Sequence, residues 1–295
     1  MKVFKKANFH THTNFCDGQN TAEEMILSAI EKGFDALGFS SHCIHPLDPD
    51  FYSPFDSNWH IPFDKVSAYA EEIRSLQKKY ENQIKIFLGF EADYFSSAST
   101  GSAIPDKKAY AQFKPDFLIG SVHFVDTPLG FYTVDHKTTE VLKNLKHFYS
   151  TGNGKIDGEK AVCDYFAAQR EMLKKGQFEI WGHPDLIRKR NGELCFFDEN
   201  DSWYKEELEA TAKEAAKAGV IAEINTGAIY RKSMDDCYPS AFFLELLHSK
   251  GVPVCIDSDA HTTDGLDCAF ERASALAKKT GYTELVYPGN IVIAL

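Results

Sequence analysis

The chain of 295 residues is 43% hydrophobic and 25% charged, values typical of a soluble globular enzyme, and its length suits an α/β barrel, so we expect a single domain over residues 1–295. The formal net charge of -11 argues against a nucleic-acid partner, because affinity for phosphate backbones is built from excess Lys and Arg, whereas bound cations could still attract a small phosphorylated substrate. The first residues lack the apolar core of a signal peptide, and no run approaches the roughly 20 apolar residues of a membrane helix, so we expect a cytoplasmic protein without a membrane partner.

Predicted strands and predicted helices alternate from the N-terminus, and the pair recurs about seven times. In chain order, the strands cover 3–9, 36–40, 84–90, 117–121, 178–181, 220–224 and 252–256. The helices, whose apolar residues recur three and four positions apart, cover 22–32, 63–80, 159–175, 204–218, 240–249 and 269–279. Strands that alternate with crossover helices predict a parallel sheet, and ligands of such sheets gather at the C-terminal ends of the strands.

Glycines and loops support these boundaries. Gly33, Gly176, Gly219 and Gly251 each follow a predicted helix, where a left-handed residue commonly ends the helix. Residues 44–61 and 95–108 interrupt the alternation and directly follow predicted strands. We therefore interpret both stretches as long loops that could cover a site at the strand ends.

Metal-ligand residues stand at the ends of six or seven of the apolar runs. His10 and His12 are two residues apart in an extended segment, so both side chains can point to the same side, and Asp259 and His261 have the same spacing. A single histidine is more often an ordinary polar residue than a ligand, but the coincidence of ligand type and position predicts a metal cluster. Imidazole and carboxylate ligands suit zinc, manganese or iron, whereas the seven cysteines contain no CxxC pair that would indicate a thiolate zinc module.

The ordered motifs resemble those of the polymerase and histidinol phosphatase (PHP) superfamily, and within it the stand-alone histidinol-phosphate phosphatases. The resemblance covers almost the whole chain and implies an α/β fold, a distorted TIM-like (β/α)7 barrel with a metal cluster at the C-terminal rim of the strands. The motifs are His10-Thr11-His12, Ser41-His42, Gly89-Phe90-Glu91, Gly120-Ser121-Val122-His123, Gly182-His183-Pro184 and Ser258-Asp259-Ala260-His261.

The resemblance also implies three divalent metal ions. The first would be bound by His10, His12, Glu91 and Asp259. The second would be bound by Glu91, His123 and His183, and the third by Asp17, His42 and His261. Some relatives with three ions carry a histidine where this chain has Asp17. The chain departs from the family pattern at this residue, and binding of the third ion depends on it.

The activity that the resemblance implies is hydrolysis of a small phosphomonoester, L-histidinol phosphate, to L-histidinol and phosphate in histidine biosynthesis. We expect a hydroxide that bridges two ions to attack phosphorus, with Glu91 and His123 essential to the centre. Asp17 or a metal-bound water would deliver a proton to the leaving group. Replacement of Glu91 or His123 by Ala is expected to abolish turnover.

Substrate contacts are predicted from basic and polar residues near the strand ends. We expect Arg188 and Arg231 to bind the phosphate, because guanidinium matches phosphate oxygens in pairs, with Arg190 and Lys232 as weaker candidates. For the amine and imidazole of the substrate we favour His45 and Asn225, and the wider set of candidates is Asp93, Tyr94, Phe55, His60 and Tyr230.

Three other functions remain open at this point. A 3'-5' exonuclease is disfavoured by the net acidity and by the lack of a basic stripe with stacking aromatic residues. A protein-tyrosine or nucleotide phosphatase of the same fold would differ only in the shape of its pocket. A non-catalytic metal-binding protein would have no need of the long loops or of arginines near the strand ends. The oligomeric state is left open by the sequence.

Overall fold

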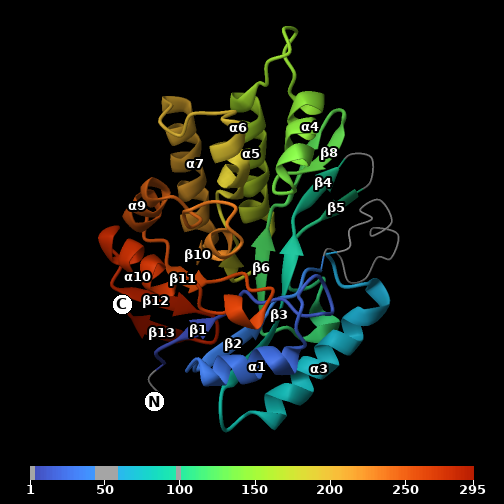
Figure 1. Ribbon diagram of the computed structural model, residues 1–295, viewed down its shortest axis with the longest axis vertical. Coiled ribbons are helices and arrows are strands. Elements are labelled where there is room, and N and C mark those ends of the chain that lie inside the picture. Colours follow the sequence, from blue (N-terminus) through green and yellow to red (C-terminus); the bar gives the residue numbers. More distant parts are fainter. Residues whose placement is uncertain (1–3, 44–58, 98–100) are drawn as a thin grey trace.

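Seven parallel strands form the centre of the protein, which is described by a computed structural model over residues 4–43, 59–97 and 101–295 (Figure 1). Their order in the sheet is β1-β2-β3-β6-β9-β10-β11, and every neighbouring pair is parallel. The strands are β1 Ala7–Asn8, β2 Ala36–Phe39, β3 Lys85–Asp93, β6 Phe117–Ser121, β9 Ile180–Trp181, β10 Ile221–Asn225 and β11 Val254–Asp257. All seven predicted strands are therefore confirmed, and they follow one another around the sheet with a single sense.

The sheet closes into a nearly complete barrel through contacts between the residues that follow β1 and β11. A parallel bridge joins Thr11, just after β1, to Ala260, just after β11. His12 donates its backbone N–H to the carbonyl of Ala260 over 2.9 Å, and the N–H of Ala260 bonds the carbonyl of His10 over 3.1 Å. Because β1 is only two residues long, this closure involves the residues beyond the strand ends. The distorted (β/α)7 barrel that the sequence predicted is confirmed.

Helices surround the strands and connect most of them to the next one, whereas the connection from β3 to β6 holds two short strands and a 3-10 helix (Figure 1). The six predicted helices are all present, and α1 begins at a capping box in which Thr21 and Glu24 bond each other's backbone N–H groups. Among the described residues, no helix is long and apolar enough to cross a membrane. The α-helices are α1 Ala22–Glu31, α3 Val66–Lys79, α4 Thr138–Phe148, α5 Gly158–Lys175, α6 Asn191–Leu194, α7 Ser202–Ala218, α8 Gly227–Tyr230, α9 Ala241–Ser249 and α10 Phe270–Lys279, and the 3-10 helices are η2 Phe63–Lys65, η3 Ala111–Phe113, η4 Leu186–Arg190 and η5 Thr263–Gly265.

Three of the four glycines predicted to end helices do so in the left-handed region. Gly33, Gly219 and Gly251 have φ of 75°, 70° and 71°. The prediction is wrong for Gly176, which ends α5 with φ of -76° and ψ of 160°. Glycine is required there for space, because a Cβ atom would lie 2.6 Å from the ring of Phe178.

The interior of the barrel below the rim is filled by aromatic rings that lie against glycines. A Cβ atom on Gly38 of β2 would lie 2.8 Å from the rings of both Phe9 and Phe117, and one on Gly89 of β3 would lie 2.5 Å from Phe117. Residues two apart in a strand share a face, so Glu91 projects to the same interior side as Gly89. The aromatic residues therefore form the floor on which the polar side chains at the rim rest.

Additional short elements decorate the barrel. The hairpin of β4 (Phe95–Ser97) and β5 (Gly101–Ala103) lies in the stretch predicted as a loop over 95–108, so that prediction is corrected in part. A second hairpin, β7 (Phe124–Thr127) and β8 (Gly130–Thr133), follows β6, and β12 (Glu284–Tyr287) pairs with β13 (Ile291–Ala294) near the C-terminus. Of the predicted loop 44–61, the part 44–58 lies outside the described residues.

Candidate metal centre

The side chains predicted as metal ligands converge at the C-terminal rim of the barrel. Their donor atoms form four overlapping groups of three or four, and within each group all donor atoms lie within 4.8 Å of one another. Parallel strands end at the same edge, which is why residues far apart in the sequence meet there. The nine residues are His10, His12, Asp17, His42, Glu91, His123, His183, Asp259 and His261.

Glu91 lies at the middle of the set. Its Oε2 atom is 3.0 Å from Nε2 of His10 and 2.8 Å from Nδ1 of His42. Its Oε1 atom is 2.9 Å from Nε2 of His183 and 3.5 Å from Nε2 of His123. The two carboxylate oxygens thus face two different sets of imidazoles, which is the arrangement that a carboxylate bridging two cations requires. We call His10, Glu91, His123, His183 and Asp259 the inner group.

Asp259 lies close to His10 and His12, and His10 also contacts Glu91. Its Oδ1 atom lies 3.1 Å from Nε2 of His12 and 3.7 Å from Nε2 of His10. Asp259 and His183 both have a left-handed backbone, with φ of 50° and 27°. Such conformations cost about 1–3 kcal/mol for residues other than glycine and persist mainly where the surroundings impose them. The backbone here is therefore strained at two of the candidate ligands.

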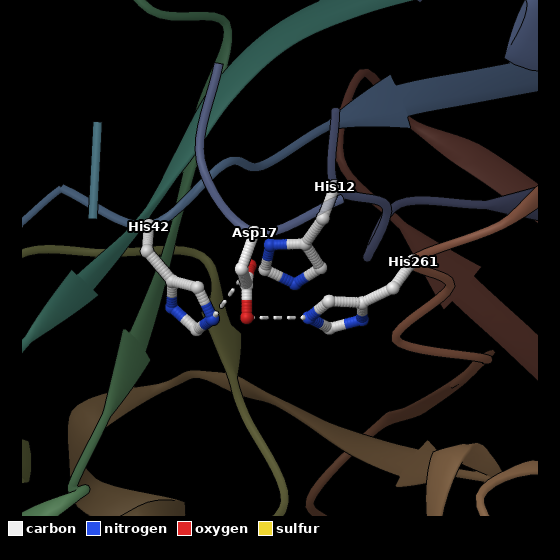
Figure 2. A group of neighbouring side chains, drawn as sticks. All are labelled: His12, Asp17, His42 and His261. Atoms are coloured by element: carbon white, nitrogen blue, oxygen red, sulfur yellow. Dashed lines mark ion pairs between the residues drawn. The ribbon is translucent and has the colours of Figure 1, made fainter. Parts of the chain in front are cut away.

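The remaining ligands form an outer group of His12, Asp17, His42 and His261 (Figure 2). Asp17 points between two imidazoles, with Oδ2 at 3.2 Å from Nε2 of His261 and Oδ1 at 3.9 Å from Nε2 of His42. Asp17 and His261 keep 34% and 21% of their side chains exposed. The outer group therefore opens to solvent, while sharing His12 and His42 with the inner ligands.

The ligand atoms fit a bound cation better than they fit one another. The atoms Nε2 of His10, Nε2 of His12 and Oε2 of Glu91 are buried, and none makes a hydrogen bond of acceptable geometry with a described residue. Buried polar atoms normally have a partner, and an ion that accepts their lone pairs would provide it. Nitrogen and oxygen donors in this combination suit zinc, manganese or iron.

Two carboxylates behind the inner group orient its imidazoles. Glu223 accepts a hydrogen bond from Nδ1 of His10 over 2.6 Å and another from the backbone N–H of His183 over 2.7 Å. Asp93 lies 2.5 Å from Nδ1 of His123 and 2.7 Å from Nε2 of His60. When a carboxylate accepts the Nδ1 proton, Nε2 is left free to bind a metal. Glu223 was not predicted as a site residue, although its strand-end position resembles that of Glu91.

Neighbouring imidazoles keep the carboxylates ionised. Burial acts to raise the pKa of Glu91, but His42 and His10 outweigh it and hold this pKa well below the usual value. Burial likewise opposes the charge on Asp17, and the hydrogen bond from His261 together with the charge of His42 lowers its pKa. Both carboxylates are therefore anionic at neutral pH, the form that binds a cation.

The imidazoles differ in their affinity for protons. Burial, with the charges of two neighbouring imidazoles, lowers the pKa of His12 to about 3. Burial also acts to lower the pKa of His123, but the carboxylates of Asp93 and Glu91 raise it to about 10. For His42, too, the effect of Glu91 exceeds that of burial, and the pKa rises to about 10. His12 is thus neutral among these side chains, whereas the other two hold protons that a metal ion would displace.

A cavity of about 280 Å³ lies over the ligands. Its volume suits a small molecule. Four basic side chains face it together with the carboxylates and imidazoles of the metal-ligand set. The lining residues are Asp17, His42, Trp59, His123, Asp135, His136, Lys137, Lys189, Arg190, Arg231, Asp259 and His261.

The two arginines predicted to bind phosphate have different surroundings. Arg231 lines the cavity, where Nη2 donates to Oδ2 of Asp259 over 2.7 Å. Arg188 does not line it, and its guanidinium is occupied by Glu199 at 2.7 Å and Asp236 at 2.9 Å. The structure therefore places Arg231 at the cavity and Arg188 among acidic neighbours that were not predicted, outside the lining of the cavity.

Asn225 also lies away from the cavity. It is fully buried, and its side chain donates to Glu223 over 3.0 Å and accepts the N–H of Gly227 over 2.8 Å. Both ends of its amide are used within β10 and the following turn, and a contact of Asn225 with substrate stays a prediction. His45 lies outside the described residues.

The described members of the wider set of predicted substrate contacts are buried or bonded to other side chains. Asp93 is fully buried and bonded to His60, so neither faces an open rim. Tyr94 is buried, and the hydroxyl of Tyr230 bonds that of Thr262 over 2.7 Å. Phe55 lies outside the described residues. Of the weaker phosphate candidates, Arg190 lines the cavity and Lys232 does not.

The barrel and its rim of histidines and carboxylates define the class of the protein. The model of the PHP domain family matches residues 8–227, so the chain belongs to this family. The matched part contains seven of the nine candidate ligands, and Asp259 and His261 lie beyond it.

The chain is similar over almost its full length to histidinol-phosphatases. It is 28% identical over 285 residues to the probable histidinol-phosphatase of Schizosaccharomyces pombe, an alignment that covers 94% of this chain and 87% of the relative. The fold matches the crystal structure of the hisK protein from Listeria monocytogenes with a TM-score of 0.78 and 21% identity, covering 90% of this chain and 99% of that one. The histidinol phosphate phosphatase of Lactococcus lactis, solved with zinc, L-histidinol and phosphate, matches with a TM-score of 0.65 and 20% identity over 95% of both chains.

Proposed function

We propose that the protein is a metal-dependent phosphomonoesterase that hydrolyses L-histidinol phosphate to L-histidinol and phosphate. The main observation in support is the convergence of nine ligands beneath a small cavity that also presents basic side chains. The similarity to histidinol-phosphatases supports the choice of substrate. The Lactococcus lactis relative binds zinc, L-histidinol and phosphate, which is the same combination of cofactor and products.

In this proposal the ligands hold three divalent ions. His10, His12, Glu91 and Asp259 would bind the first, and Glu91, His123 and His183 the second. Asp17, His42 and His261 would bind the third, with His12 at its edge (Figure 2). When bound, such ions polarise phosphoryl oxygens and make a coordinated water acidic enough to act as a nucleophile.

The chain's own residues would prepare the substrate for hydrolysis. The guanidinium of Arg231, held by Asp259, faces the cavity and can donate to phosphate oxygens. Glu91 is fully buried and anionic, so it offsets part of the positive charge that the ions bring. Asp17 is ionised at neutral pH, so the proton that the leaving alkoxide takes up comes from another donor.

We also propose that residues 1–295 form a single domain. Asp259 and His261 lie beyond the matched residues 8–227, and yet their side chains belong to the same groups of ligands as His10 and His12. The closing bridge between Thr11 and Ala260 likewise joins the two ends of the chain. A truncation after residue 227 is therefore expected to leave an incomplete site.

Other phosphoesterases of this fold are the nearest alternatives, namely a protein-tyrosine or nucleotide phosphatase and an exonuclease. The test is phosphate release by the purified, metal-analysed protein from L-histidinol phosphate, a nucleoside monophosphate, phosphotyrosine and an oligonucleotide. We expect a clear preference for L-histidinol phosphate. This activity should be lost in His123→Ala and kept in Asp126→Asn, which changes an exposed carboxylate of β7. A strong preference for the oligonucleotide would overturn the proposal.

The role of Arg231 has its own test. Loss of hydrogen bonds to a charged group costs about 1.5–3 kcal/mol, so Arg231→Gln should raise KM for the substrate roughly 10- to 100-fold. Arg272→Gln serves as a matched control, because Arg272 is 49% exposed and pairs with Asp235 away from the cavity. Equal kinetic constants for the Arg231 variant and the wild type would remove this residue from the phosphate site.

A further inference from the structure

One corner of the cavity is used neither by the metal ligands nor by Arg231. It is formed by Trp59, Asp135 and His136, which all line the cavity. The rings of Trp59 and His136 lie 6.0 Å apart between centroids with an angle of 48° between their planes. The corner therefore combines a carboxylate with two aromatic rings, a chemistry suited to the part of a substrate beyond its phosphate.

The hairpin of β7 and β8 places this corner beside the metal centre. The hairpin starts directly after His123, and the N–H of Val134 bonds the carbonyl of His123 over 3.0 Å as the chain returns. Asp135 and His136 follow at once. The corner and the candidate ligand His123 thus line the same cavity and lie next to each other in the fold.

Asp135 has one oxygen engaged and one oxygen available. Its Oδ2 atom accepts a hydrogen bond from Nζ of Lys189 over 2.8 Å, and among the described residues its Oδ1 atom has no hydrogen-bond donor. The Asp135 side chain is 24% exposed, against 10% for that of Lys189. A carboxylate oxygen that is open to a small cavity is suited to a cationic donor such as a primary ammonium.

The aromatic part of the corner is held in place by its neighbours. The backbone carbonyl of His136 accepts a hydrogen bond from Nε of Arg190 over 2.8 Å. The Trp59 ring packs against Phe124, with centroids 6.2 Å apart. Two aromatic side chains that line a small cavity offer a contact surface to a flat heterocycle.

We propose that Trp59, Asp135 and His136 form a leaving-group pocket that selects phosphomonoesters carrying a primary ammonium next to a flat nitrogen heterocycle. Asp135 accepts the ammonium, and the two aromatic residues contact the heterocycle. The inference rests on the proposed function, in which the phosphate of the same substrate lies at the metal centre. A substrate without the amine leaves the Asp135 oxygen unpaired, which is the basis of the discrimination.

The alternative role of Asp135 is to position Lys189, with no contact to the substrate. In that case its replacement would disturb the phosphate end of every substrate equally. A substrate pair that differs only in the amine separates the two roles, namely L-histidinol phosphate and 2-(imidazol-4-yl)ethyl phosphate.

The test compares kcat/KM of the wild type, Asp135→Asn and Trp59→Leu with both esters. We expect Asp135→Asn to reduce kcat/KM for L-histidinol phosphate by about 10- to 100-fold more than for the ester without the amine. Trp59→Leu should reduce both values, because both esters carry the imidazole. The control is Asp126→Asn in the same hairpin, whose exposed carboxylate does not line the cavity. Equal losses for the two esters in Asp135→Asn, or no loss, would overturn the pocket.

A binding measurement separates failure of the pocket from failure of the proposed function. Titration calorimetry of L-histidinol into the zinc-loaded protein needs no turnover. If the wild type hydrolyses neither ester, the proposed function fails, and the pocket is still supported by weaker binding of L-histidinol to Asp135→Asn. Equal binding to the wild type and to this variant would contradict the pocket whatever the enzyme hydrolyses.

Discussion

The inner and outer groups of ligands are built from the same residue types but are held in different ways. In the inner group, His10 and Glu91 are fully buried, and Glu223 and Asp93 bind the second nitrogens of His10 and His123. In the outer group, Asp17 is 34% exposed and stands in a turn after β1. Rigid, buried ligands with fixed tautomers bind metals more tightly than exposed ones. From this difference we expect the two parts of the centre to have separate stabilities, and an ion in the outer group to be bound less tightly than those in the inner group.

The largest effect is expected for Glu91→Gln, which removes the carboxylate that faces both inner sites. Metal ions contribute several kcal/mol to the transition state, so we expect a loss of kcat/KM on the order of 10³-fold or more. Inductively coupled plasma mass spectrometry should show that the inner ions are lost as well. Full metal content with unchanged activity would contradict the distinction between inner and outer groups, because Glu91 would then not be the central ligand of the inner group.

Asp17→Asn is expected to have a smaller effect that is confined to the outer group. Asp17 would act by holding the outer ion that stabilises the leaving group, and such stabilisation contributes at least about 100-fold, so we expect kcat to fall by roughly that factor. The same variant should lose a single equivalent of metal and keep the ions beside Glu91. Loss of all metal from this variant would show that the two groups are not independent.

Asp93→Asn tests the support of the inner group. An amide cannot fix the Nδ1 proton of His123 as a carboxylate does, and loss of such a partner lowers metal affinity roughly 10- to 100-fold. Activity should therefore fall at limiting metal and return when metal is added in excess. Failure of excess metal to restore activity would point to a role of Asp93 in the chemistry itself.

The smallest effect is a release of protons when metal binds. His42 and His123, whose pKa values are raised to about 10, are protonated in the metal-free protein below that pH, and coordination requires their neutral form. His12, with a pKa of about 3, has no proton to lose. Burial acts to lower the pKa of His10, but Glu223 and Glu91 outweigh it and hold this pKa well above the usual value, so His10 adds to this release. At pH 8 we therefore expect at least two protons to be released, measured by calorimetry in buffers of different ionisation enthalpy. The affinity for metal should accordingly fall as the pH falls.

The fold and the ligand set could be predicted because both depend on local patterns. The apolar runs, the helical periodicity and the ligand residues at strand ends are all visible in short windows of sequence, and parallel strands then bring the ligands together. Glu223 and Asp93 were not recognised as partners of the ligands. An acidic residue at a strand end has the same local signal whether it binds a metal or a histidine.

The substrate contacts could not be predicted because they depend on contacts between distant residues. Arg188 and Arg231 follow strand ends in the same way, but Arg188 is bonded by Glu199 and Asp236 and does not line the cavity. The corner of Trp59, Asp135 and His136 depends on the β7–β8 hairpin, which returns the chain beside His123. Neither the contacts of Arg188 with Glu199 and Asp236 nor the β7–β8 hairpin has a periodic sequence pattern from which it could be predicted.

The most direct test of the central claim is anomalous diffraction from crystals of the zinc-loaded protein. The account predicts two ions beside Glu91 and a third between Asp17 and His261, each at about 2.0–2.2 Å from its nitrogen and oxygen ligands. After brief exposure to a chelator, the third peak should weaken first. Zinc bound only elsewhere on the protein, with no peak beside Glu91, would contradict the account.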